Sequence, residues 1–403
     1  MMTLLLFLCF PANAADDAFF QDLENFRTQS LRVQSARQNL EASSDLLFSK
    51  NLFWTPRLSL SANQSKSQIN QTVTDDRNYL AADLTWNLFR GGGDVDSLHQ
   101  AKALNKFQQL QLVNEELRIE VGAADVIFKS IFLTETKRIQ EEFLRMKEDS
   151  LKIVLDRYKQ GKMPLQEVTK SEVDLVQQKS KARLAGLDIL ENKSQIANAF
   201  VKELKTKNWL FTADTRVDLQ NKFKRPLTEQ KYWMQQALEA TWRASRATHW
   251  PSLDLKMQYQ ESPIKDRTER QWLGLLSLTL PIWSQFETTA MISADYAKYV
   301  NAKSEFTETE TSVQQKILFL NEKIKISSLN LVEAQRNFDR SKNLYQNILR
   351  GYRSGRISTN DLMLDQNRLL DTANNLAASQ LLFHQTLVES CVIVGLKTAE
   401  CLK

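Results

Sequence analysis

The arrangement of hydrophobic and polar residues predicts two very long helices. Residues 94–162 and 285–354 contain no Pro and almost no Gly, and roughly seventy residues of helix extend about 100 Å. From Val313 to Tyr352, apolar and small residues recur in alternating steps of four and three. This period of 3.5 residues is typical of helices that pack along one seam. The first stretch keeps the same period less regularly, because three polar residues interrupt it: Lys137, Gln140 and Lys147.

A different, alternating pattern predicts two β-hairpins, at residues 56–89 and 251–283. Apolar and polar residues alternate in RLSLSANQS and YLAADLTWNLF of the first, and in SLDLKMQYQ and QWLGLLSLTLPIW of the second, as in strands with one buried face. The intervening residues 66–78 and 261–270 are polar, and we expect them to form the connections. Strands of about ten residues that end in aromatic residues are also typical of membrane barrels, but the strands alone favour an ordinary half-buried hairpin.

The same features occur twice in the same order, which indicates a duplicated domain. Pro-x-Leu recurs at 56–58 and 251–253, and Tyr-x-x-Gly recurs at 158–161 and 352–355. We therefore expect the following division: a first repeat at 15–204 with its long helices at 94–204, a linking segment at 205–228, a second repeat at 229–396 with its long helices at 285–396, and a C-terminal tail at 397–403.

Each Tyr-x-x-Gly sequence is expected to end a long helix. Gly161 and Gly355 suit the position after a helix that needs a positive φ angle, and Pro164 suits the first turn of a following helix. The returning helices then begin at Leu165 and Thr359, and each forms an antiparallel hairpin with the long helix before it.

The N-terminal residues predict export. An apolar run is followed by an A-x-A sequence at 12–14, which resembles a signal-peptidase site, so residues 1–14 are expected to be a signal peptide. Cys9 fits the apolar core of this signal better than a lipid attachment site, because the preceding Leu8 is too bulky.

The two other cysteines, Cys391 and Cys401, lie close together in the sequence. In an oxidising compartment such a pair can form a disulfide, whereas side chains that point apart at the end of a helix would prevent it. The sequence leaves both outcomes open.

Composition and motifs argue against nucleic-acid binding and catalysis. The net charge of +5 is the small difference between 53 basic and 48 acidic residues, which gives no strong basic footprint. The three His residues are scattered, so no metal site is expected. Neither a phosphate-binding Gly-rich loop nor a G-x-S-x-G sequence occurs. We expect no enzyme, no cofactor and no nucleic-acid partner.

Together these features resemble the TolC-type outer-membrane efflux family, over residues 15–396. The most specific part is the turn followed by an acid, in Tyr352-Arg353-Ser354-Gly355-x5-Asp361 and again in Tyr158-Lys159-Gln160-Gly161-x5-Glu167. The resemblance implies a mainly α fold with a small β part. Three copies would share a twelve-stranded β-barrel in the lipid of the outer membrane of a Gram-negative bacterium. The helices of this homotrimer would continue as an α-helical barrel in the periplasm, with the linking segment at its equator.

The resemblance also implies partners. The helix-turn-helix tips would contact a periplasmic adaptor (membrane-fusion) protein, which connects the duct to an inner-membrane RND or ABC transporter. The expected contact residues are Tyr158, Gly161, Lys162, Met163, Tyr352, Gly355, Arg356 and Ile357.

Two acids, Asp361 and Glu167, are the candidates for a periplasmic gate. In the trimer Asp361 would form a ring of carboxylates at the aperture. Alternatively, it is an acid favoured at the start of a helix, with Thr359 or Asn360 as the N-cap. Family members often carry a second acid three residues further on, but Leu364 is found there, so a double ring is not expected.

The expected function is therefore that of a passive exit duct of a tripartite efflux pump or of a type I secretion system. The alternative is a soluble periplasmic coiled-coil scaffold or adaptor protein, in which the hairpins would be small soluble sheets. The sequence does not indicate the transported substrate.

Overall fold

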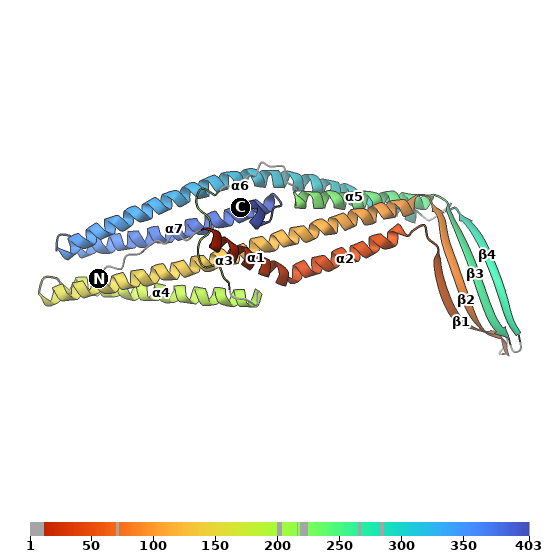
Figure 1. Cartoon of the computed structure of the whole chain (residues 1–403), viewed down its shortest axis with the longest axis horizontal. Coiled ribbons are helices and arrows are strands. Elements are labelled where there is room, and N and C mark those ends of the chain that lie inside the picture. The colour runs from red at the N-terminus through yellow and green to blue at the C-terminus, as the bar shows by residue number, and fades with distance from the viewer. Residues whose placement is uncertain are drawn as a thin grey trace. The chain divides into compact units, whose positions relative to one another are not determined.

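The computed structural model describes residues 12–69, 72–199, 204–215, 217, 225–264, 267–282 and 286–402. Most of the predicted signal peptide, including Cys9, lies outside the described residues. In chain order (Figure 1) the elements are α1 (Ala12–Gln29), α2 (Leu31–Asn51), β1 (Arg57–Ile69), β2 (Thr72–Arg90), α3 (Gly93–Lys159), α4 (Leu165–Ala199), α5 (Pro226–Arg246), the short η1 (Ala247–His249), β3 (Ser252–Ile264), β4 (Arg267–Thr279), α6 (Glu287–Arg353), α7 (Thr359–Ile393) and α8 (Thr398–Cys401).

The long helices have the predicted extent. α3 and α6 contain 67 residues each, and the returning helices α4 and α7 contain 35 each. Along α6 the residues of the predicted seam face inward; Val313, Leu320 and Tyr352 are buried. The prediction of a 3.5-residue seam in α6 is therefore confirmed. No helix among the described residues is both long and apolar enough to cross a membrane.

Two of the polar residues that interrupt the pattern of α3 also face inward, where α4 and α7 supply partners. The side-chain amide of Gln178 donates to the backbone oxygen and to Oε1 of Gln140, at 3.0 and 2.8 Å. Lys147 Nζ lies 3.0 Å from Asp174 Oδ2 and donates to Asn367 Oδ1 at 3.4 Å. Buried polar groups are tolerated where they are hydrogen-bonded, so the interruptions become polar layers within the packing.

The four strands form one antiparallel sheet in the order β1-β2-β3-β4. The predicted connections at 66–78 and 261–270 are wrong, because the strands pair almost to their ends: Ile69 pairs with Thr72, and Ile264 pairs with Arg267. Backbone groups make the ladder, so polar side chains do not end a strand.

A glycine joint links the end of β2 to α3. Gly91 and Gly92 have φ angles of +59° and +84°, which side chains with a Cβ adopt with strain. A Cβ on Gly91 would also lie 2.5 Å from Cβ of Trp250. Unusual backbone angles therefore occur at these two residues, where the strand becomes a helix.

The chain divides into two compact units, and we describe each by itself. Unit 1 holds the described parts of 12–34, 114–225 and 313–402, and unit 2 holds Ser35–Val113 and Pro226–Ser312. Both helical turns lie in unit 1, and the sheet lies in unit 2. Each unit draws on both halves of the duplicated sequence.

In unit 1, α1 and α7 anchor the described part of the linking segment. Asp22 Oδ2 accepts hydrogen bonds from the backbone N–H groups of Lys205 and Thr206, both at 2.9 Å, and from the Thr206 hydroxyl at 2.8 Å. A single buried carboxylate oxygen therefore fixes the start of the segment.

His384 on α7 holds the next turn of the segment. Its Nε2 accepts from the backbone N–H groups of Leu210 and Phe211, at 3.2 and 2.9 Å, while Nδ1 donates to the carbonyl of Gln380 at 2.7 Å. The ring is 1% exposed and lies 4.9 Å from the ring of Trp209. Burial lowers the pKa of His384 from 6.5 to about 4, although the bond to Gln380 opposes the change. The imidazole is therefore neutral at physiological pH.

Candidate functional site: the paired helical tips

Two turns of the same geometry close the helical hairpins of unit 1. Between α3 and α4 the N–H of Gly161 donates to the carbonyl of Tyr158, and the N–H of Lys162 donates to that of Arg157, both at 2.9 Å. The same two bonds surround Gly355 between α6 and α7, at 3.0 and 2.9 Å. This pattern satisfies carbonyls that a helix end leaves unpaired. We call residues 157–164 tip 1 and residues 351–358 tip 2.

The glycines of both tips have the backbone angles predicted for them. The φ angle is +68° at Gly161 and +79° at Gly355. A Cβ added at either glycine would have no heavy atom within 4 Å, apart from its chain neighbours. Backbone conformation, and not space, therefore explains why glycine occupies these positions.

The two tips pack against each other at one end of unit 1 (Figure 1). Val154 and Val168 of the first hairpin share a buried cluster with Tyr352 and Leu362 of the second. Met163 and Ile357 pack against this cluster from the two turns. The tips are therefore one packed body rather than two separate loops.

Arg157 forms a polar link between the tips. Its guanidinium donates to the backbone oxygens of Tyr352 and Arg353, the latter at 3.4 Å, and its Cζ lies 4.5 Å from the centre of the Tyr352 ring. A charged donor bound to a carbonyl and stacked on an aromatic face makes a strong contact. Arg157 is not among the contact residues predicted from the sequence.

The equivalent position of tip 2 is Gly351. This difference between the repeats affects how the tips pack. A Cβ on Gly351 would lie 2.5 Å from Cδ1 of Ile357. The missing side chain lets Ile357 fold back over its own helix. Tip 1 thus has a long cation at this position, whereas tip 2 has a glycine over which the Ile357 side chain lies. This mismatch between two otherwise matching turns is visible in the sequence and would have identified Arg157 as a candidate.

The two tyrosines of the repeated motif have different environments. Tyr158 is 41% exposed, whereas Tyr352 is fully buried. The Tyr352 ring fills the core of the tips beneath Arg157, and the adaptor contact expected for this residue stays a prediction.

Six exposed residues form what we call the tip surface: Lys159, Gly161, Lys162, Arg353, Gly355 and Arg356. Met163 and Ile357 are half-buried, since they pack on the cluster between the tips. Four of the six carry positive charge, so this surface suits an acidic or carbonyl-rich partner.

Ser358, and not Thr359 or Asn360, is the N-cap of α7. Its hydroxyl accepts from the backbone N–H of Asp361 at 3.2 Å and donates to the Asp361 carboxylate at 2.7 Å. The cap lies one residue earlier than predicted because Thr359 already has helical geometry. Asp361 is exposed and belongs to this capping arrangement.

Glu167 holds the equivalent position on α4. It is half-buried; one carboxylate oxygen lies 3.1 Å from Lys170 Nζ, and Oε2 has no hydrogen-bond partner. Among the described residues, no group of three or more His, Cys, Asp or Glu could hold a metal ion.

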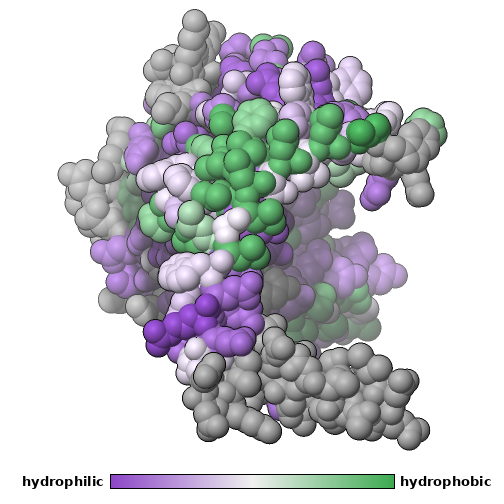
Figure 2. Space-filling view, turned by 90° about the vertical axis from the view of Figure 1, so that its right-hand side faces the viewer, coloured by the Kyte–Doolittle hydropathy of each residue, from purple (hydrophilic) through white to green (hydrophobic). Residues whose placement is uncertain are grey.

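Unit 2 carries a second candidate surface, the apolar face of the sheet. The register places apolar side chains opposite one another across all four strands. Figure 2, viewed from the side on which the sheet lies, shows hydrophobic side chains gathered in a patch. The most exposed large residues of this face are Leu58, Leu60, Leu80, Trp272, Leu276 and Leu278. A patch of this extent indicates an apolar environment or partner.

The opposite face of the sheet is more polar. It carries Asp83, Asp254, Lys256 and Gln258, although Leu275 and Leu273 also lie on it. Among the described residues no further strand pairs with the outer edges of β1 and β4. A sheet with one apolar face and two open edges is prone to pair with other strands.

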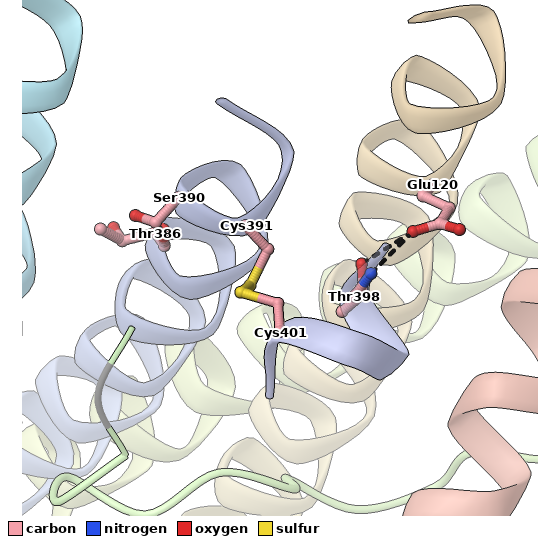
Figure 3. Close-up of a disulfide and its surroundings, with 6 residues drawn as sticks. All are labelled: Glu120, Thr386, Ser390, Cys391, Thr398 and Cys401. Carbon is pink, nitrogen blue, oxygen red and sulfur yellow. Dashed lines mark hydrogen bonds between the residues drawn. A yellow bond between two sulfur atoms is a disulfide. The ribbon is translucent and has the colours of Figure 1, made fainter. Parts of the chain in front are cut away.

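Cys391 and Cys401 form a disulfide (Figure 3), which resolves the alternative that the sequence left open. The bond joins the end of α7 to α8, in unit 1 and away from both tips.

Three solved structures show how closely this fold matches known proteins. The outer membrane protein VceC from Vibrio cholerae has a TM-score of 0.82 at 13% identity, over 94% of this chain and 96% of its own. The CmeC outer membrane channel of Campylobacter jejuni has a TM-score of 0.81 at 14% identity, over 96% and 88%. The MtrE outer membrane channel of Neisseria gonorrhoeae, in its open state, has a TM-score of 0.75 at 14% identity, over 94% and 89%.

No protein-family model matches the sequence, and no curated protein does. At identities of 12 to 15% the likeness to the solved structures concerns the fold. The resemblance expected from the repeated turns and hairpins is therefore confirmed for the fold: the chain folds like these outer-membrane channels over nearly its whole length.

Proposed function

We propose that the chain is the passive outer-membrane exit duct of a tripartite efflux pump or of a type I secretion system. Three copies would join their sheets into a twelve-stranded barrel in the outer membrane of a Gram-negative bacterium. Their helices would continue as an α-helical barrel into the periplasm. The chain itself performs no catalysis, so energy for transport comes from an RND or ABC transporter in the inner membrane.

The observation that carries this proposal is the open sheet with one exposed apolar face. In lipid, every backbone N–H and C=O needs a partner, and an open edge is not tolerated. Four strands from one chain leave two such edges. Copies of the same sheet, joined edge to edge, satisfy them, and the apolar face then meets lipid.

The proposed adaptor contact is the tip surface. Its four cations and two glycines offer a basic surface where a partner can approach the backbone closely. Tyr158, Met163 and Ile357 would border the contact, while Tyr352 supports it from within.

We also propose that Asp361 lies at the periplasmic aperture, where one carboxylate from each copy attracts cations. Replacement of Asp361 by Asn keeps an oxygen near Ser358 and removes the charge. In planar bilayers, we expect Asp361→Asn to lower the preference for cations over anions. Ser358→Ala weakens the cap, at a cost of about 1 kcal/mol, and should leave that preference unchanged. An equal preference for cations over anions in wild type and Asp361→Asn would show that Asp361 is not part of the gate.

Fractionation tests the function as a whole. Cells that express the full chain are separated into periplasmic, inner-membrane and outer-membrane fractions, and the detergent extract is cross-linked and assayed for conductance. We expect an outer-membrane trimer with ion conductance. A soluble periplasmic monomer would instead support the coiled-coil scaffold or adaptor alternative.

A further inference from the structure

The end of the chain folds back through a third turn of the kind found at the tips. Gly395 has a φ angle of +79°, and the N–H of Leu396 donates to the carbonyl of Cys391 at 3.2 Å. The reversal brings α8 beside the end of α7, where Cys401 bonds to Cys391 (Figure 3). We call residues 391–402 the C-terminal latch.

The latch delivers two hydrogen-bond donors to a buried acid on another helix. Thr398 donates to Glu120 Oε2 on α3 through its backbone N–H at 2.9 Å and through its hydroxyl at 3.0 Å. Thr398 is fully buried, and Glu120 is 6% exposed. Figure 3 shows this contact at the start of α8 and the disulfide at its end.

Charged groups from three elements surround Glu120. Arg27 of α1 and Lys397 of the latch both attract it, and both also lie within 3.9 Å of Glu116, one turn earlier on α3. Burial raises the pKa of Glu120, while the bonds from Thr398 and the two cations oppose the change. Without the latch this carboxylate loses both donors from Thr398 and the cation on Lys397.

We propose that the C-terminal latch is closed by oxidation and that the disulfide is what holds Thr398 on Glu120. The chain is then a substrate of thiol–disulfide exchange, and it reaches its final packing only after it has met a disulfide oxidant. The inference rests on the export that is part of the proposed function, because such oxidants belong to compartments outside the cytosol. It does not depend on transport.

The exchange proceeds in two displacements. Cys391 belongs to α7, whereas Cys401 belongs to α8, the part of the latch that oxidation brings into place, so the thiolate of Cys401 attacks the oxidant's disulfide first and releases one of its thiols. The thiolate of Cys391 then attacks the Cys401 sulfur of the mixed disulfide and expels the second thiol. The oxidant gains the two electrons, and the protons of the two cysteines end on its thiols.

Hydrogen exchange of the full chain in detergent, with and without dithiothreitol, tests the coupling. We expect reduction to speed amide exchange in a peptide covering 394–402 by at least tenfold. A peptide covering 351–357, which has the same glycine turn without a cysteine, should not change. Unchanged exchange at 394–402 after reduction would overturn the proposal.

The reciprocal test measures the equilibrium constant for formation of the Cys391–Cys401 disulfide in a glutathione redox buffer. If the disulfide stabilises the contact between Thr398 and Glu120, this contact stabilises the disulfide by the same free energy. Thr398→Val removes the hydroxyl donor and keeps the shape. We expect it to lower the equilibrium constant for disulfide formation about tenfold, the size of one hydrogen bond to a charged group. Thr359→Val on the same chain is the matched control. The same equilibrium constant for wild type and Thr398→Val would contradict the coupling, and neither result bears on conductance.

Discussion

His384 holds the linking segment through a nitrogen that accepts hydrogen bonds only while the imidazole is neutral. Two backbone N–H groups point at Nε2. A proton on this atom would turn an acceptor into a donor that faces two donors. The fold therefore favours the neutral ring, in the same direction as burial, which lowers the pKa of His384 to about 4.

The lowered pKa predicts acid sensitivity of the linking segment. Above pH 6.5 the His384 ring is neutral whether the linking segment is bound to it (docked) or released (undocked). The contacts of His384 then make their full contribution to the stability of the docked segment. Between pH 6.5 and about 4 the undocked ring takes up a proton while the docked ring does not, so stability falls as the pH falls. At about 1.4 kcal/mol per pH unit the loss is limited to roughly 3 kcal/mol.

The protection of the Leu210 and Phe211 amides against hydrogen exchange, corrected for intrinsic rates, measures this effect. His384→Asn keeps a side-chain acceptor that does not titrate. We expect protection that decreases toward pH 4 in wild type and a flatter profile in the variant. The same slope in both proteins would show that other groups cause it.

The left-handed backbone at Gly355 leads to a second prediction about a single residue. A left-handed backbone costs about 1–2 kcal/mol for a residue with a Cβ, and Asn tolerates it better than β-branched residues do. No atom obstructs a Cβ here, so the penalty comes from the backbone alone. We expect Gly355→Val to lower the thermal stability of the tips and to weaken adaptor capture, with Gly355→Asn close to wild type. Equal behaviour of the two variants would rule out the backbone explanation.

Among the contacts between structural elements, Arg157 of tip 1 provides a polar link from the first hairpin to the second. Arg157→Ala removes the donor to two carbonyls of tip 2, and a hydrogen bond that involves a charged group contributes about 1.5–3 kcal/mol. We expect deuterium uptake in residues 351–358 to rise about tenfold or more, with a smaller rise for Arg157→Lys, which lacks the planar group. Arg350→Ala removes an exposed cation that bonds only to its own helix and serves as the control. A rise of the same size in this control would point to charge rather than to the contact.

The sequence predicted those elements that a repeating pattern specifies. The extents of α3 and α6, the seam of α6 and the glycines of both tips follow from helical periodicity and backbone angles. The strands were predicted, but their ends were not, because polar residues can continue a ladder made by the backbone. The N-cap was misplaced by one residue, since Ser358, Thr359 and Asn360 are all good caps.

Contacts between elements far apart in the sequence were not predictable in the same way. Lys147 looked like an interruption, yet Asp174 and Asn367 compensate for its burial. The exposure of Tyr158 and the burial of Tyr352 depend on which tip lies over the other. A periodic pattern identifies the buried face of a helix, but it does not identify the partner.

At the scale of the whole molecule, we expect a Lys substituted on one face of the sheet to have a different effect from a Lys substituted on the other face. Leu276 lies on the apolar face, and the next residue, Ser277, lies on the other face opposite Asp254. A Lys facing lipid costs about 2–4 kcal/mol at the bilayer midplane and less near the interfaces. We expect Leu276→Lys to reduce the amount of trimer in the outer-membrane fraction and Ser277→Lys to leave it near wild type. Equal loss from both would argue against lipid at the apolar face.

The pairing of β2 with β3 also constrains the order in which the molecule is built. Arg90 and Ser252, which pair at one end, are 162 residues apart, so the central ladder has a very high contact order. During synthesis, the first hairpin exists long before the strand that completes it. Until then its apolar face and free edge are exposed to aggregation. We therefore expect a chain with this topology to need protection of the half-finished sheet until residue 252 and the strands after it arrive.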